Sequence, residues 1–267
     1  MPLAVCATPI GNLEDITLRV LRELDEADIV LCEDTRRTRA LLERHGLRAK
    51  LVSYHQHNEA RRAGEMLPRL RAGGRIALVS DAGLPGVSDP GARLISAALE
   101  AGVPVTVLPG PSAVETALVA SGLVAERYQF VGYLPRGERA LLTLADELLR
   151  WPHAAVAFES PQRLGRSLQV LARVIPGRAA AVCRELTKRF EEVARGSVAE
   201  LADRFGEPPK GEVTLVLGGA EPEAAEEGAA GDAVTELVAA GVSRRQATNV
   251  VARLTGVSRN RLYRTSL

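Results

Sequence analysis

Three loops rich in glycine and proline follow short apolar runs of the sequence, at residues 8–12, 80–91 and 109–112. Loops of this kind allow backbone N–H and C=O groups to come close to a ligand. In open α/β sheets, ligands bind beyond the carboxyl ends of the strands. The three loops therefore predict a ligand site at successive strand ends. Neither G-x-G-x-x-G after the first strand nor G-x-x-x-x-G-K-[ST] occurs, which disfavours a dinucleotide-binding Rossmann site and excludes a P-loop NTPase.

A charged cluster, Glu33-Asp34-Thr35-Arg36-Arg37, follows another apolar run. These side chains either face the ligand site or begin a helix, where acidic groups complement the helix dipole. Their strand-end position favours a functional role.

His55 and His57 would share one face of an extended segment, but no cysteine or third histidine lies at ligand spacing. We therefore expect no metal there, and a polar loop that contacts nucleic acid or handles protons.

Apolar runs and helix-length segments alternate over the first half of the chain, as is typical of βαβ units with a parallel sheet. Ser112 and Glu115 have the spacing of a capping box for the last of these helices. Strands are expected at 3–7, 29–32, 75–79 and 103–108, and helices at 16–24, 35–45, 59–71, 92–101 and 113–121.

The pattern changes near residue 127, where a second α/β domain with a mixed sheet is expected. The sequence thus predicts an α/β fold with domains at 1–125 and 126–220. Within the second domain, strands are expected at 128–132, 154–158, 179–183, 189–194 and 212–217, with helices at 138–150, 161–174 and 197–205.

The tail differs in charge from the rest of the chain. Residues 221–232 carry five acids and no base, and are expected to form an acidic linker. Residues 233–267 carry six arginines and one glutamate. A helix at 233–240, a second one begun by a Ser243–Gln246 capping box and a basic third one from Ser258 resemble a helix-turn-helix nucleic-acid module. A small helical bundle used for dimer contacts is the alternative.

Composition limits the cellular setting more than it limits the partner. The net charge is only +1, so the overall charge does not indicate a nucleic-acid partner. The basic residues are nearly all arginines, which suit phosphate contacts but equally reflect codon bias.

Three widely spaced cysteines argue against a disulfide framework, and no apolar run approaches a membrane span. The N-terminus lacks the features of a signal peptide, so a cytoplasmic protein without membrane contact is expected.

Seven motifs in order resemble the ribosomal small subunit methyltransferase I family, cytidine-2′-O-methyltransferases of the tetrapyrrole methylase superfamily. The resemblance spans essentially the whole chain. Leu84, where threonine is commoner, and Phe158, in place of a frequent tyrosine, each lack a hydroxyl group. The motifs are Ala7-Thr8-Pro9-Ile10-Gly11-Asn12-Leu13, Glu33-Asp34-Thr35-Arg36, His55-Gln56-His57-Asn58-Glu59, Leu78-Val79-Ser80-Asp81-Ala82-Gly83, Leu108-Pro109-Gly110-Pro111-Ser112, Phe158-Glu159-Ser160-Pro161-Gln162-Arg163-Leu164 and Arg184-Glu185-Leu186-Thr187-Lys188.

The resemblance implies a two-domain tetrapyrrole methylase-like fold that binds S-adenosyl-L-methionine in the cleft between its domains. It also implies 16S ribosomal RNA or the 30S subunit as substrate, and a homodimer. The residues that would hold the cofactor are Pro9, Ile10, Asp81, Ala82, Gly83, Leu84, Pro85, Ser112, Ala113, Phe158, Leu186, Gly211 and Glu212.

Methyl transfer to a ribose oxygen is an SN2 reaction that requires alignment and benefits from a base. Asp34 is the hypothesis for that base, with Glu33 second, while Arg36 and Lys188 would orient phosphate or ribose. Asp34→Asn is then expected to cut methyl transfer and spare cofactor affinity. RNA contacts are expected from His55, His57, Arg244, Arg245, Arg259, Arg261 and Arg264.

Two other functions compete with RNA methylation. Superfamily relatives methylate tetrapyrrole rings, so a small-molecule methyltransferase is the nearest alternative. A non-catalytic nucleic-acid-binding protein is a further one, but it leaves the three cleft loops unexplained.

Overall fold

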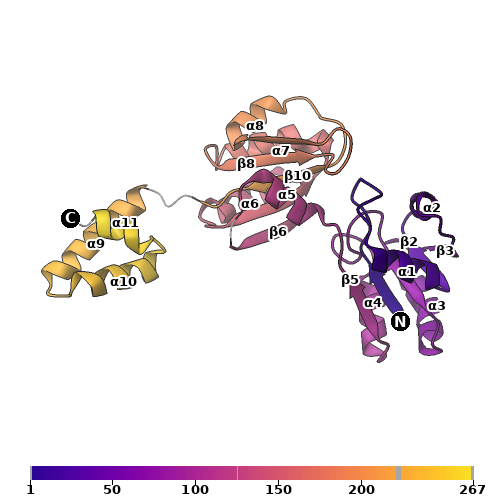
Figure 1. Ribbon diagram of the computed structural model, residues 1–267. Coiled ribbons are helices and arrows are strands. Elements are labelled where there is room, and N and C mark those ends of the chain that lie inside the picture. The colour runs from indigo at the N-terminus through magenta and orange to yellow at the C-terminus, as the bar shows by residue number, and fades with distance from the viewer. Residues whose placement is uncertain (1, 125, 221–223, 266–267) are drawn as a thin grey trace.

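A computed structural model describes residues 2–124, 126–220 and 224–265. Its first sheet holds five parallel strands in the order β3-β2-β4-β1-β5 (Figure 1). The strands are β1 (Leu3–Cys6), β2 (Ile29–Cys32), β3 (Leu51–Ser53), β4 (Ile76–Val79) and β5 (Val105–Leu108). The helices that connect them are α1 (Leu18–Glu26), α2 (Thr35–Arg44), α3 (Glu59–Arg71) and α4 (Ala92–Glu100).

The central strands of this sheet are buried on both faces, which is why they read as unbroken apolar runs. Leu3 and Val5 of β1 pack on the side of α3 and α4, whereas Ala4 and Cys6 pack on the side of α1 and α2. Strand β3 was not predicted, because it has only three residues and lies half-buried at the sheet edge.

The second sheet is mixed, in the order β6-β7-β10-β8-β9. Strands β6 and β7 are parallel, and β10 runs antiparallel to both of its neighbours. The predicted strand at 189–194 is displaced to 192–197. The elements are β6 (Tyr128–Tyr133), α6 (Glu138–Leu149), β7 (Ala154–Glu159), α7 (Pro161–Ala172), β8 (Ala179–Arg184), β9 (Glu192–Ser197), α8 (Val198–Arg204) and β10 (Val213–Leu217).

Helix α5 (Ala113–Ser121) packs on the second sheet, opposite α6, α7 and α8. Its Ala117 and Leu118 contact the sheet residues Val156 and Cys183 in one apolar cluster. The boundary predicted at residue 125 falls after this helix, whereas the packing unites the helix with the sheet that follows. The chain therefore crosses from one sheet to the other at the loop 109–112.

The tail forms three helices, α9 (Ala224–Ala239), α10 (Arg244–Thr255) and α11 (Arg259–Thr265), which Figure 1 shows apart from the two sheets. They enclose a core of their own that includes Val234, Val251 and Leu262. The acidic linker expected at 221–232 is wrong for residues 224–232, which are helical, while 221–223 lie outside the described residues.

Both predicted capping boxes differ from the structure. Ser112 and Ser243 begin helices, but their hydroxyls donate to the side chains of Glu115 and Gln246 and cap no backbone N–H. A complete capping box instead occurs at Ser197, before α8. None of the helices in the described part of the chain has the length and apolarity needed to cross a membrane.

Candidate active site

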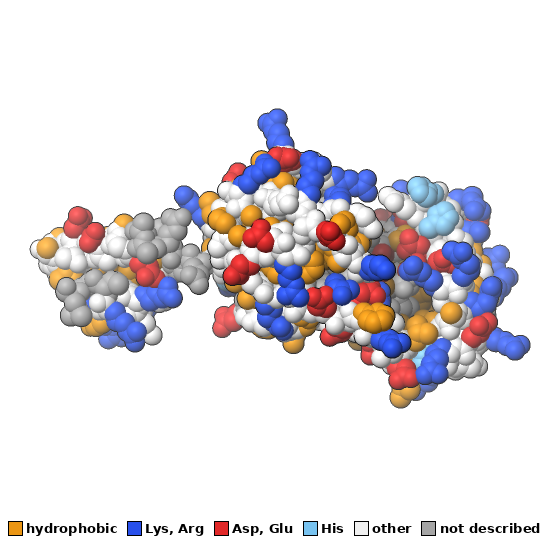
Figure 2. Space-filling view, turned by 90° about the horizontal axis from the view of Figure 1, so that it is seen from above, with side chains coloured by type: hydrophobic (Ala, Val, Ile, Leu, Met, Phe, Trp, Pro, Cys, Tyr) orange, Lys and Arg blue, Asp and Glu red, His pale blue; other side chains and the backbone are white. Residues whose placement is uncertain are grey.

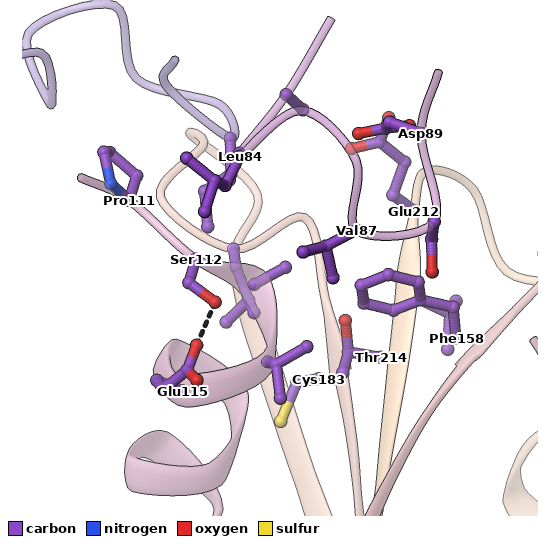
Figure 3. A pocket seen from close by; sticks show the side chains of 18 of the residues that line it. Leu84, Val87, Asp89, Pro111, Ser112, Glu115, Phe158, Cys183, Glu212 and Thr214 are labelled. Atoms are coloured by element: carbon purple, nitrogen blue, oxygen red, sulfur yellow. Dashed lines mark hydrogen bonds between the residues drawn. The ribbon is translucent and has the colours of Figure 1, made fainter. Parts of the chain in front are cut away.

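A cavity of about 860 Å³ lies between the two sheets, where loops from the first meet strands of the second. All three predicted loops contribute to its wall, and Figure 3 labels residues of two of them, among them Leu84 and Ser112. Among the proposed cofactor residues, Pro9 and Pro85 lie outside the lining. Those that line the cavity are Ile10, Asp81, Ala82, Gly83, Leu84, Ser112, Ala113, Phe158, Leu186, Gly211 and Glu212.

Backbone contacts hold the three loops together. Thr8 and Gly83 exchange N–H···O bonds of 2.8 and 3.0 Å, and the Thr8 hydroxyl donates to the Ser80 carbonyl at 3.0 Å. Gly83 has a φ of +76°, which a residue with a side chain rarely adopts. A Cβ at Gly110 would lie 2.8 Å from the Ala7 Cβ. The glycines thus serve the close approach of loop to loop at the strand ends.

The second sheet supplies an aromatic wall. Phe158 packs edge-on against Phe130, with ring centroids 4.9 Å apart, and against Tyr133 at 5.6 Å. The carboxylate of the adjacent Glu159 is buried and accepts from the Ser167 hydroxyl at 2.6 Å and from Arg163. These bonds fix the end of β7 beneath the cavity.

The cavity is acidic. Asp81, Asp89, Glu115 and Glu212 line it with Glu159, and among the described lining residues Arg37 is the one basic side chain. Figure 3 places Asp89 and Glu212 on one side and Ser112 with Glu115 on the other. Such a cleft favours a cationic ligand and repels phosphate.

Asp89 has the most perturbed carboxyl group of this lining. Burial, and then the nearby charge of Glu33, raises the pKa of Asp89 to about 6. Burial also raises the pKa of Glu33, which is not among the lining residues. Asp89 was missed by the sequence prediction, because the loop 80–91 was interpreted through its backbone. A carboxylate within a glycine-rich strand-end loop was the signal available.

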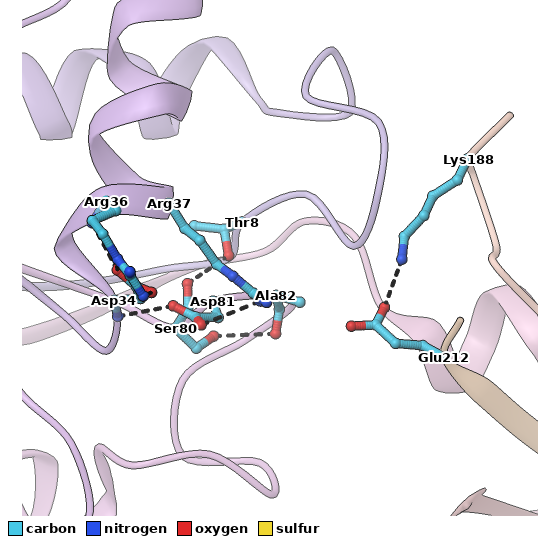
Figure 4. A network of polar contacts seen from close by, with 9 residues as sticks. All are labelled: Thr8, Asp34, Arg36, Arg37, Ser80, Asp81, Ala82, Lys188 and Glu212. Atoms are coloured by element: carbon cyan, nitrogen blue, oxygen red, sulfur yellow. Dashed lines mark hydrogen bonds and ion pairs between the residues drawn. The ribbon is translucent and has the colours of Figure 1, made fainter. Parts of the chain in front are cut away.

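Asp34 does not line the cavity; it caps helix α2. Its carboxylate accepts from the Arg36 backbone N–H at 2.8 Å and from the Arg36 guanidinium at 2.7 and 3.1 Å (Figure 4). These hydrogen bonds lower the pKa of Asp34. Arg36 likewise lies outside the lining, with 86% of its side chain exposed. Of the two interpretations of this charged cluster, the start of a helix is therefore the one that describes Asp34 and Arg36.

Lys188 lies on the opposite side from Asp34, beside Glu212 (Figure 4). Its Nζ donates to Glu185 at 2.8 Å and to Glu212 at 3.0 Å. The neighbouring Thr187 accepts from the Asn12 backbone N–H at 2.9 Å, which joins the second sheet domain to the first loop. Lys188 therefore sits at the cavity rim through its bond to a lining residue.

The predicted RNA-contacting residues lie in two separate places, both outside the cavity lining. His55 and His57 follow β3, with ring centroids 5.9 Å apart. In the tail, Arg244 stacks over Tyr263 at 4.5 Å and Arg261 pairs with Glu227 at 2.6 Å, so both serve the helix packing. In the described ranges, no three His, Cys, Asp or Glu side chains form a set that could hold a metal ion.

Comparison with known proteins places the chain in a family. The family model for Tetrapyrrole (Corrin/Porphyrin) Methylases matches residues 2–202. "Ribosomal RNA small subunit methyltransferase I" from Mesorhizobium japonicum is 44% identical over 265 residues, covering 98% of this chain and 90% of the relative. The protein of that name from Thermotoga maritima is 42% identical over 220 residues, which cover 82% of this chain and 99% of the relative.

Solved structures share the fold. Uroporphyrin-III C-methyl transferase from Thermus thermophilus, complexed with S-adenyl homocysteine, superposes with a TM-score of 0.57 at 23% identity, over 81% of this chain and 96% of that one. The predicted α/β fold class is thereby confirmed. The chain belongs to the tetrapyrrole methylase family and, within it, to the proteins named ribosomal RNA small subunit methyltransferase I.

Proposed function

We propose that this protein transfers a methyl group from S-adenosyl-L-methionine to the 2′-hydroxyl of a cytidine ribose in 16S ribosomal RNA. The observation that carries the proposal is the acidic, aromatic-walled cavity at the strand ends of a chain 44% identical to a ribosomal RNA methyltransferase. The S-adenyl homocysteine complex of the Thermus thermophilus enzyme supports the cofactor class.

The cavity residues fit the cofactor in charge and shape. When bound, S-adenosyl-L-methionine supplies an electrophilic methyl group on a positively charged sulfur. Glu115 complements that charge and the cofactor's ammonium group, as do Asp81 and Glu212, whose charges Arg37 and Lys188 offset in part. Phe130 and Phe158 offer apolar ring surfaces against which an adenine ring would pack. The size of the cavity, about 860 Å³, is in the range of small-molecule sites.

Asp89 is the proton acceptor that we propose for the ribose hydroxyl. It lines the cavity, and its pKa of about 6 suits a base that works near neutral pH. Glu33 remains the second candidate, because its pKa is also raised and it is close enough to Asp89 to perturb it. Asp34 is replaced in this role, since its carboxylate is engaged by Arg36 and the start of α2.

The charges around the cavity imply that RNA phosphates are held outside it. Three of the five lining carboxylates pair with Arg37, Arg163 and Lys188, and the other two leave the cavity acidic, so it admits a neutral ribose more easily than a phosphate. Lys and Arg side chains lie on both sides of the place where the two sheet domains meet (Figure 2). The arginines of the tail helices would add further phosphate contacts.

The test is transfer of labelled methyl from S-adenosyl-L-methionine to three acceptors: 16S RNA, 30S subunits and a porphyrinoid. We expect labelled 2′-O-methylcytidine in one of the first two. Label in the porphyrinoid alone would establish the small-molecule alternative. Mass mapping of 16S RNA from cells lacking the protein should show one unmethylated cytidine. The resemblance further predicts a cytoplasmic homodimer, which light scattering of the purified protein and cell fractionation would check.

A further inference from the structure

An exposed phenylalanine, Phe190, lies four residues along the chain from Leu186, which lines the cavity. The chain has four phenylalanines. Phe130 and Phe158 belong to the cavity wall and Phe205 is buried, whereas Phe190 is 66% exposed. The Arg189 guanidinium lies 5.5 Å from the centroid of its ring. Arg189 forms no ion pair with any described residue, so its charge is available to a ligand.

Phe190 belongs to a segment that borders the cavity, which we call the rim loop (Glu185–Glu191). Leu186 of this loop lines the cavity, and Lys188 bonds to Glu212, another lining residue. The exposed ring is thus two residues along the chain from a side chain anchored at the cavity mouth. A nucleotide whose ribose enters the cavity would bring its neighbours to this loop.

The rim loop is held rigidly although it is exposed. Glu185 and Thr187 have φ values of 50° and 64°, a left-handed conformation that non-glycine residues rarely adopt. The Thr187 backbone N–H donates to the Glu191 carboxylate at 2.6 Å, and the Thr187 hydroxyl accepts from Asn12. Glu185 accepts from the Glu212 N–H at 3.1 Å. Strained backbone that its surroundings maintain is concentrated at functional sites.

We propose that Arg189 and Phe190 form a stacking platform for an unpaired RNA base next to the methylated cytidine, an inference that rests on the proposed function. Single-stranded RNA is recognised by stacking of its bases on aromatic rings and arginine planes, with cations on the phosphates. The rim loop presents a ring and, next to it, a guanidinium whose charge no described carboxylate pairs, whereas Lys188 is held by Glu185 and Glu212. A protein partner would favour an apolar surround, whereas this ring is flanked by Arg189 and Glu191.

The experiment uses the full-length protein and compares Phe190→Ala, Phe190→Leu and Phe190→Trp. Stacking on one aromatic side chain changes affinity about 5- to 100-fold. We expect Phe190→Ala to weaken binding of a single-stranded 16S fragment by that factor, with the KM for S-adenosyl-L-methionine unchanged. Phe190→Trp should restore affinity, and its fluorescence should be quenched by the RNA. Phe190→Leu should not restore it, because leucine keeps apolar area without a ring.

Leu99→Ala is the matched control, since Leu99 is 60% exposed at the end of α4, the end away from the cavity loops. It should bind RNA as the wild type does. If Phe190→Ala bound the RNA fragment as tightly as the wild type, or if Phe190→Leu restored full affinity, the proposed stacking platform would be wrong. So would a change of oligomeric state in Phe190→Ala, which would make the ring a subunit contact. RNA binding is measured without catalysis, so a wild type that methylates no RNA would refute the proposed function separately.

Discussion

Asp34 and Asp89 show how surroundings decide which carboxylate is able to take up a proton. Three hydrogen bonds from Arg36 stabilise the charged form of Asp34 and lower its pKa. Burial and the charge of Glu33 disfavour the charged form of Asp89, which raises its pKa to about 6. A base is most effective when its pKa lies near the working pH. The cavity residue therefore has the suitable value and the capping residue does not.

Asp89→Asn is expected to lower kcat about 10²- to 10⁴-fold, the usual contribution of a general base, with little change in S-adenosyl-L-methionine affinity. Wild-type kcat/KM should rise with pH and level off above about 6, where Asp89 is ionised. Initial rates of methyl transfer between pH 5 and 8.5 provide the measurement. Asp34→Asn is the control and should retain activity, since asparagine caps a helix as well as aspartate does. The reverse ranking would return the role to Asp34.

The same residue has a predictable effect on stability. The pKa of Asp89 is raised in the folded protein, so the folded protein binds this proton more tightly than the unfolded chain does. Its contribution to stability is present below the ordinary pKa of 3.8 and is lost as the pH rises through about 6. Asp89→Asn should therefore raise Tm at pH 8 and leave it nearly unchanged at pH 4. A lower Tm at pH 8 would contradict this placement of the carboxylate.

At the scale of elements, the contact between the loop 8–12 and the rim loop sets the width of the cleft. Gly11 faces residues 186–188, and a Cβ there would lie 2.6 Å from both Lys188 Cγ and Thr187 Oγ1, and 2.7 Å from the Leu186 carbonyl oxygen. The lysine stem is flexible, but the backbone carbonyl is not. An added methyl group must therefore push the two loops apart.

Gly11→Ala is expected to lower kcat/KM about 10²-fold, because displacement by about 1 Å misaligns the reacting groups. Cofactor affinity, measured by calorimetry, should fall as the cleft opens. Gly64→Ala is the matched control, since nothing lies within 4 Å of a Cβ at that position of helix α3. It should keep full activity and gain up to ~1 kcal/mol of stability from helix propensity. A Gly11→Ala variant as active as this control would mean that the loops move freely.

Element positions were predictable where a pattern was long or sharply bounded. The run Ile29–Cys32 and the helix Ala113–Ser121 have the predicted limits, because turn residues bound both. Strand β3 was missed, since three residues carry no periodicity. The start of α9 was missed as well, because its alanine- and glutamate-rich sequence is as typical of a linker as of a helix.

The site was predictable in its backbone loops but not in its side-chain roles. Glycine and proline mark strand-end loops directly, and Ile10, Gly83 and Ser112 all line the cavity. Whether an acid is a cap or lies in a cleft depends on packing between distant segments, which spacing does not encode. Asp34 and Asp89 both follow strands of one sheet, and only the contacts of Arg36 and the burial of Asp89 distinguish them.

At the scale of the whole molecule, the acidic cleft and the arginine-bearing tail are separate parts of the structure. Four arginines of the tail, Arg245, Arg253, Arg259 and Arg264, form no ion pair with a residue that the structure describes. The tail helices also have their own core. The alignment with the Thermotoga maritima relative is 220 residues long and covers 99% of that protein, which is therefore about as long as the two sheet domains together. A relative of that length has no room for a counterpart of the tail, which agrees with a tail that takes no part in the cavity.

Truncation after Ala220 should therefore leave S-adenosyl-L-methionine affinity near that of the full chain and weaken RNA binding. Each phosphate contact contributes about 0.7–0.9 to the slope of log K against log salt, so losing four would flatten that slope by about 3. Titrations of 16S RNA between 50 and 300 mM salt, roughly the range in which such contacts dominate, give the slope. Replacing the four arginines by glutamine in the full chain should reproduce the smaller slope with the helices intact. If truncation weakened cofactor and RNA binding equally, the tail would instead be stabilising the sheet domains.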